Sequence, residues 1–244
     1  MTLAMDKAAL HDFIQVAFPQ VADDFAVDRL DAEGLTVRQI ASQLAAVEGL
    51  YGEAAPLPPE GVLLPETYHF SYGDGRADIV RRMQNAMRDT LDRLWENRAP
   101  NLPFDTKEEA LVLASIVERE TAIPAERPRI AAVFVNRLRK GMRLQSDPTV
   151  IYGLSDGLGV LDRPLLRVDL QKDHPYNTYT RDGLPPHPIC NPGRDSLRAV
   201  LNPIESNEYY FVADGSGGHA FARTLDEHNT NVRRWRQFQR EQRQ

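Results

Sequence analysis

Hydrophobic residues recur with a helical period in several separate stretches of this chain. In 33–45 the apolar positions fall at i, i+3, i+4 and i+7 counted from Val37, and Thr36 precedes them as an N-cap. The segment 76–98 repeats the pattern over a longer distance, with arginines and carboxylates filling its other face. Both stretches are therefore predicted to be amphipathic helices that bury one side.

Two further helices are predicted in the middle of the chain. The segment 106–120 begins with Thr106 and Glu109 at capping-box spacing, and it is apolar almost all round its middle. A helix that is apolar on every side belongs at the centre of a fold. The segment 124–141 has a helical pattern of its own, which Gly141 ends.

The periodicity largely disappears between residues 142 and 193. Long irregular segments inside compact domains usually serve a function. Beyond it, 195–203 is predicted to be a short helix and 209–213 a strand. The segment 214–222 is predicted to be a turn that returns into a second strand, and 225–244 a polar, basic helix. The pattern predicts an α+β fold with a helical core, a small antiparallel sheet and a long irregular segment that forms a cleft.

The segment 54–61 contains three prolines and a glycine, which break any helix. It is the best candidate for a boundary, and a length of 244 residues is compatible with one or two domains. We therefore expect an N-terminal segment, 1–59, and a second, larger unit, 60–244.

Composition narrows the classes of function. The formal net charge of -6 argues against a broad phosphate-binding surface, so we expect no nucleic-acid partner, and the arginines of 233–240 read as a solvated helix face. The single cysteine, Cys190, cannot form an internal disulfide. No stretch reaches the roughly 18 apolar residues that span a bilayer, so the chain as given is expected to be soluble.

The common metal and nucleophile motifs do not account for any activity. The six histidines show no paired ligand spacing, and the chain has no HExxH or CxxC motif and no glycine-rich phosphate loop before a helix. We therefore expect no metal site.

The carboxylates that follow the apolar run "LASIV" are the remaining candidates. A carboxyl group on an apolar helix loses solvation when it ionises, so its pKa rises and it can hold a proton near neutral pH. Glu118 and Glu120 lie about 200° apart around the helix axis, so they do not form a dyad. Periodicity alone does not choose between them, nor between catalysis and a solvated last turn.

Several long motifs occur in an order that resembles the endolytic murein transglycosylase (YceG-like) family. They are "EGVLLPETYHF", "ASIVERET", "VFVNRLRKGMRLQSDPTVIYG", "YNTYTRDGLPPHPICNPG" and "YYFVADGSGGHAF". The resemblance runs from about residue 60 to the C-terminus. It identifies 60–244 as a YceG-like catalytic domain, and 1–59 resembles at most the tail of a LysM-like region.

The resemblance implies a lyase that cuts the MurNAc–GlcNAc β-1,4 bond inside peptidoglycan glycan strands. It assigns the acid/base role to Glu118, a supporting role to Glu120, and no cofactor. It also implies that polar residues of the irregular segment bind substrate: Gln145, Ser146, Asp147, Tyr152, Asn177, Thr178 and Tyr179.

A single glutamate is sufficient for such a lyase, with 1,6-anhydro-MurNAc ends as the product. The alternative is a non-catalytic peptidoglycan-binding module with the same fold. The resemblance further implies a natural protein anchored in the inner (cytoplasmic) membrane by an N-terminal helix absent from this chain, with its catalytic domain on the periplasmic face. Peptidoglycan synthases are candidate partners.

Overall fold

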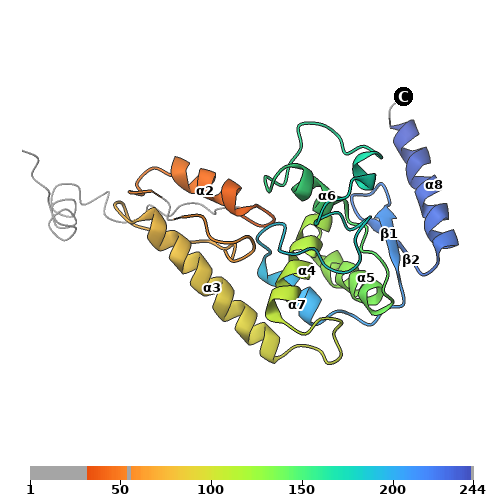
Figure 1. The fold of residues 1–244 in the computed structure, drawn as a ribbon, viewed down its shortest axis with the longest axis horizontal. Coiled ribbons are helices and arrows are strands. Elements are labelled where there is room, and N and C mark those ends of the chain that lie inside the picture. Colours follow the sequence, from red (N-terminus) through yellow and green to blue (C-terminus); the bar gives the residue numbers. More distant parts are fainter. Residues whose placement is uncertain (1–31, 54–55, 243–244) are drawn as a thin grey trace, which may run out of the picture.

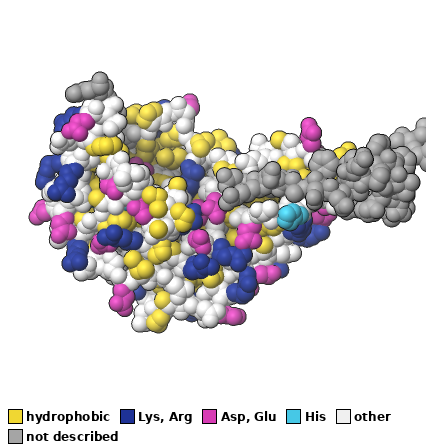
Figure 2. Space-filling view, turned by 180° about the vertical axis from the view of Figure 1, so that it is seen from behind, with side chains coloured by type: hydrophobic (Ala, Val, Ile, Leu, Met, Phe, Trp, Pro, Cys, Tyr) yellow, Lys and Arg dark blue, Asp and Glu magenta, His cyan; other side chains and the backbone are white. Residues whose placement is uncertain are grey.

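A computed structural model describes residues 32–53 and 56–242 of the chain. Its elements are α2 (Val37–Ala46), α3 (Arg76–Glu96), α4 (Lys107–Glu120), the 3-10 turn η1 (Pro124–Glu126), α5 (Arg127–Arg139), α6 (Asp147–Leu154), the 3-10 turn η2 (Asp169–Gln171), α7 (Arg194–Leu201), β1 (Tyr210–Ala213), β2 (His219–Ala222) and α8 (Leu225–Glu241). The molecule is elongated, with α2 and α3 at one end, α4, α5 and α7 in the middle, and the hairpin with α8 at the other end (Figure 1). On the face drawn in Figure 2, basic and acidic side chains are interspersed.

The predicted helix starts are confirmed where a capping box marks them. Thr36 accepts a hydrogen bond from the backbone of Gln39, whose side chain accepts one from the backbone of Thr36. Thr106 and Glu109 form the same pair at the start of α4. Each box satisfies two backbone donors that the helix itself leaves unpaired.

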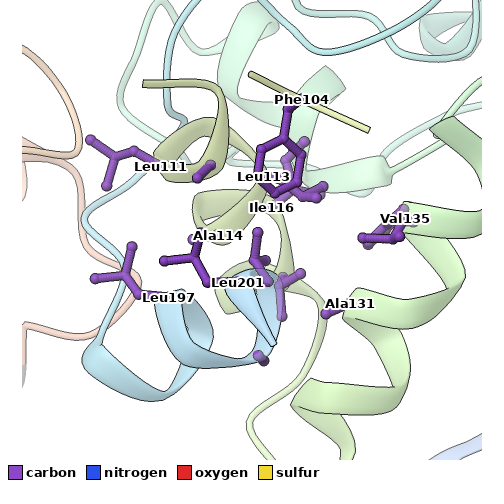
Figure 3. Packing of buried hydrophobic residues seen from close by; sticks show 14 of the residues in the cluster. Phe104, Leu111, Leu113, Ala114, Ile116, Ala131, Val135, Leu197 and Leu201 are labelled. Atoms are coloured by element: carbon purple, nitrogen blue, oxygen red, sulfur yellow. The ribbon is translucent and has the colours of Figure 1, made fainter. Parts of the chain in front are cut away.

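Helix α4 lies at the centre of the main core, as its apolar pattern predicts. Leu111, Leu113 and Ile116 of α4 are buried in one cluster with residues of α5 and α7 (Figure 3). Phe134 of α5 and Leu197 of α7 are fully buried in the same cluster. Because α4 is packed from several sides, its last turn, which carries both candidate glutamates, has a fixed position.

The segment predicted as one helix over 124–141 is a 3-10 turn followed by a shorter helix. η1 ends at Glu126, and α5 begins at Arg127 with a proline in its first turn. Because η1 and α5 follow α4 after only a few residues, Glu126 and Arg127 lie beside the end of α4.

A second core cluster joins residues on both sides of the expected boundary at residue 59. Ile40 and Leu44 of α2 are buried together with Leu63, Ile79 and Met83. The described residues before residue 59 therefore share a core with residues that follow it, and the division into 1–59 and 60–244 stays a prediction. The part of 1–59 that precedes residue 32 lies outside the described residues.

The segment 142–193 contains more regular structure than the sequence pattern predicts. Helix α6 begins after Ser146 with Pro148 in its first turn, and η2 follows farther along. We interpreted this stretch as irregular because α6 has only 8 residues, too few to show a helical period. The rest of the segment is built of turns and extended chain.

The two strands form an antiparallel hairpin in which Tyr210 pairs with Ala222 and Ala213 with His219. Helix α8 packs against this hairpin. Its basic residues therefore lie on a helix that the hairpin covers on one side. The α+β class with a small antiparallel sheet is confirmed. Among the described residues, every helix is too short or too polar to cross a bilayer.

Candidate active site

Glu118 occupies a buried ion pair. Its Oε1 accepts a hydrogen bond from Arg127 Nη2 at 2.9 Å, and its Oε2 accepts one from the backbone N–H of Gly193 at 2.8 Å. The Glu118 side chain is only 3% exposed. Glu33 also reaches Arg127, at 3.2 Å. Burial raises the pKa of Glu118, whereas Arg127 and the N–H of Gly193 oppose that rise. Both carboxylate oxygens are therefore engaged by the protein, and little of the side chain is accessible from outside.

Glu120 has a different environment, one residue beyond Arg119 at the end of α4. It is partly exposed, and its Oε1 accepts a hydrogen bond from Ser146 Oγ. No salt bridge to Glu120 is present among the described residues. One carboxylate oxygen is therefore oriented by Ser146, while the other is available to a ligand.

The surroundings raise the pKa of Glu120 to about 7. Desolvation by the surrounding protein is the largest cause, and the negative charge of Asp147 adds to it. The hydrogen bond from Ser146 and the charges of His219 and Arg137 act in the opposite direction. A carboxyl group with this pKa is protonated in about half of the molecules at neutral pH, which is what a general acid requires.

The backbone that carries Ser146 is held against the segment around Thr178. The N–H of Ser146 donates to Thr178 Oγ1 at 3.0 Å, and the N–H of Gln145 donates to the carbonyl of Thr178 at 3.1 Å. Gln145 is exposed and adopts a left-handed conformation with φ of 51°. Such a backbone is unfavourable for a residue with a Cβ and is often found at functional sites.

Asp147 and Tyr179 form the second pair of predicted site residues that the structure brings together. The Tyr179 hydroxyl donates to Asp147 Oδ1 at 2.5 Å. Burial raises the pKa of Tyr179, and Asp147 raises it further. We name Glu120, Ser146, Asp147 and Tyr179 the Glu120 cluster.

Asn177 and Thr178 were predicted to bind substrate, but the structure buries both. Asn177 is 1% exposed, its amide donates to the carbonyls of Lys172 and Leu170, and its Oδ1 accepts from the N–H of Tyr179. The Thr178 hydroxyl is hydrogen-bonded to the Ser146 N–H and to Thr149. Their polar atoms are used inside the protein, so this geometry gives them a supporting role rather than direct contact with a sugar.

Tyr152 lies outside the Glu120 cluster. Its hydroxyl is 3.5 Å from Glu60 Oε2, and its ring packs at a tilt on Tyr176 with 4.9 Å between centroids. Glu60 also accepts hydrogen bonds from the N–H of Val37 and from Asn191, and burial raises its pKa to about 7. These contacts join α6 to the start of α2.

Sequence reasoning did not identify Glu60, Glu126 or Arg127 as relevant to the site. Arg127 is nine positions from Glu118 and belongs to another helix, so no spacing rule predicts the pair. Glu60 follows a proline-rich stretch that reads as a linker. The described residues contain no group of three or more side chains that could hold a metal ion.

The fold and these carboxylates describe an α+β protein with two glutamates of raised pKa at the end of one helix, of which Glu118 is buried in an ion pair and Glu120 is partly exposed. A family model of the YceG-like family matches residues 20–234, and the chain belongs to that family.

The chain is also similar to individual proteins with names or solved structures. It is 40% identical over 173 residues to an endolytic murein transglycosylase from Bacillus subtilis (strain 168), covering 70% of this chain and 46% of that protein. It is 34% identical over 176 residues to an endolytic murein transglycosylase from Streptococcus pneumoniae serotype 2 (strain D39 / NCTC 7466), covering 71% of this chain and 31% of that protein. The chain therefore spans less than half the length of these relatives.

The crystal structure of a yceG-like protein from Listeria monocytogenes has a related fold. The match has a TM-score of 0.65 at 31% identity and covers 93% of this chain and 81% of that chain. The similarity thus extends over most of the fold.

Proposed function

We propose that this chain is the catalytic part of an endolytic lytic transglycosylase that cuts the MurNAc–GlcNAc β-1,4 bond inside glycan strands. Membership of the YceG-like family and the similarity to two named endolytic murein transglycosylases support the substrate class. The observation that carries the chemistry is Glu120, a partly exposed carboxyl group whose pKa is raised to about 7 at the end of a rigid helix.

The acid/base role is assigned to Glu120 in this proposal, whereas the family resemblance assigned it to Glu118. The reason is the hydrogen bonding of the two groups. Glu118 is bound through both oxygens to Arg127 and Gly193, and its side chain is buried. Glu118 then serves to hold α4, α5 and the backbone at Gly193 together.

The proposed reaction needs one carboxyl group. Protonated Glu120 donates its proton to the bridging oxygen, and the glycosidic bond breaks as positive charge develops at C1 of MurNAc. The N-acetyl group of the substrate stabilises that charge. Ionised Glu120 then takes the proton from the C6 hydroxyl, whose oxygen bonds to C1 and gives the 1,6-anhydro end. The attacking hydroxyl is already tethered to the substrate, which raises its effective concentration.

Digestion of purified peptidoglycan tests this assignment. We expect wild-type protein to release soluble fragments and Glu120→Gln to lose about 10²- to 10⁴-fold in rate, because glutamine has no proton to donate. Glu118→Gln is the matched control, two residues away on the opposite side of the same helix. Near-wild-type turnover of Glu120→Gln together with loss of activity in folded Glu118→Gln would return the role to Glu118.

The competing function is a peptidoglycan-binding module with the same fold. Such a module would bind glycan strands and release no soluble fragment, so the same digestion separates the two functions. Partnership with peptidoglycan synthases and attachment to the cytoplasmic membrane remain predictions from the family resemblance.

A further inference from the structure

His219 begins strand β2, and its imidazole is held by Glu126 at the end of η1. The backbone N–H of His219 donates to Glu126 Oε1 at 2.8 Å, and the ring Nδ1 lies 2.7 Å from Glu126 Oε2. Thr121 Oγ1 donates to the same Oε2 at 3.2 Å. Since Thr121 directly follows Glu120, one carboxylate ties the imidazole to the end of α4.

The contacts of Glu126 define the tautomer of the ring. Burial works against ionisation of Glu126, but the hydrogen bonds from His219 and Thr121 outweigh it and lower the pKa of Glu126. An ionised carboxylate only accepts hydrogen bonds, so the proton of the neutral imidazole is on Nδ1. Nε2 then carries the lone pair and is an acceptor.

Aromatic neighbours fix the plane of the ring. The imidazole meets Phe211 edge-on, with 5.4 Å between centroids and 90° between planes, and Phe221 at 6.4 Å. The side chain of His219 is 15% exposed, so the ring is held on several sides and still reaches the surface. The hydroxyl of Thr121, the residue that follows Glu120, shares the Glu126 carboxylate with the ring, which places His219 near the end of α4.

We propose that His219 Nε2 accepts a hydrogen bond from a hydroxyl group of the sugar bound against Glu120. The proposal rests on the proposed function, because it takes the ligand to be a glycan strand. Sugars present many hydroxyl donors, and an imidazole whose tautomer is set by a carboxylate is an acceptor already oriented for one of them. Glu126 is then a positioning residue that acts through His219.

Two substitutions of His219 test the roles of the two ring nitrogens independently. In His219→Asn the amide nitrogen takes the place of Nδ1 and keeps the donor toward Glu126, but nothing replaces Nε2. In His219→Gln the longer amide offers an oxygen near the position of Nε2 and gives up the donor at Nδ1. The first variant therefore tests the sugar contact, and the second tests the contact with Glu126.

The measurement is the affinity for a soluble tetrasaccharide of alternating GlcNAc and MurNAc, by calorimetry, with the Glu120→Gln protein as parent so that nothing is cleaved. Loss of one neutral hydrogen bond predicts a rise in Kd of roughly 2- to 13-fold for His219→Asn. A smaller rise is expected for His219→Gln. The melting temperature of His219→Asn should stay close to that of the parent.

An unchanged Kd in His219→Asn would overturn the proposal. So would a rise in Kd that accompanies a matching fall in melting temperature in both variants, since that pattern indicates a structural role. Failure of the proposed function is distinguishable. If the parent binds the tetrasaccharide with the predicted pattern and wild-type protein releases no fragments from peptidoglycan, the lyase reaction is excluded and the His219 contact is supported.

Discussion

Replacing Glu120 and Glu118 by glutamine, one at a time, is expected to change stability in opposite directions. The pKa of Glu120 is raised from 4.5 to about 7, so the folded state holds a proton that the unfolded state has lost at intermediate pH. At pH 8 that difference costs the wild-type protein about 3 kcal/mol. Glutamine has no charge to desolvate, so Glu120→Gln should recover about 1–3 kcal/mol at that pH, which corresponds to roughly 2–12 °C in Tm.

Glu118→Gln removes the carboxylate from a buried guanidinium. Arg127 is 6% exposed and keeps its positive charge, and its remaining short contact is with the half-exposed Glu33 at 3.2 Å. Breaking one partner of a buried ion pair leaves the other charge uncompensated. We therefore expect Glu118→Gln to lose about 2–4 kcal/mol of stability.

The assay is thermal unfolding of wild type and both variants at pH 8 and at pH 4. Near pH 4 Glu120 is largely protonated in the folded and the unfolded protein, so the gain in Glu120→Gln should nearly vanish there. This pH dependence is an internal control for the cause. The reasoning assigns a stabilising ion pair to Glu118 and a costly buried charge to Glu120. It would be refuted if, at pH 8, Glu120→Gln were less stable than wild type and Glu118→Gln more stable.

Three other outcomes follow from the contacts. Asn177→Ala should lower stability by about 1–3 kcal/mol, seen as a fall in Tm with turnover per folded molecule kept, because its amide serves the carbonyls of Lys172 and Leu170. Gln145→Gly relieves a φ of 51°, so Tm should hold or rise while turnover falls; Asn101→Gly, at φ of 57°, is the matched control and should leave turnover unchanged. The pKa values of Glu60 and Glu120 are both raised to about 7, so the folded state binds more protons than the unfolded state between about pH 4.5 and 7. The free energy of unfolding, measured across that pH range, should therefore fall as the pH rises.

The helices could be predicted from the sequence where local signals exist. The capping boxes at Thr36 and Thr106 determine the starts of α2 and α4, and the apolar residues of α4 predict its central place. Helix α6 was missed because its 8 residues are too few for a period, and its start depends on Ser146, whose position is set by Thr178.

The site could be predicted only in part, for a related reason. The spacing predicts that Glu118 and Glu120 lie on different sides of the helix and do not form a dyad. Their roles, however, depend on partners that are distant in sequence. Arg127 and Gly193 engage Glu118, while Ser146 orients Glu120. Similarly, a run such as "YNTY" contains polar residues, but the sequence does not indicate that Asn177 is used inside its own loop. Motif resemblance identified the region, and hydrogen bonding distinguished contact residues from supporting ones.

The most direct test of the central claim is the mass of the fragments released from purified peptidoglycan. A lyase in which one carboxyl group both gives and takes the proton consumes no water. We predict MurNAc ends in the 1,6-anhydro form, each lighter by one water than the hydrolytic product. Fragments that end predominantly in reducing MurNAc would contradict the account and would require a second carboxylate to activate water. Asp147, next to Glu120 in the cluster, would then be the first to replace.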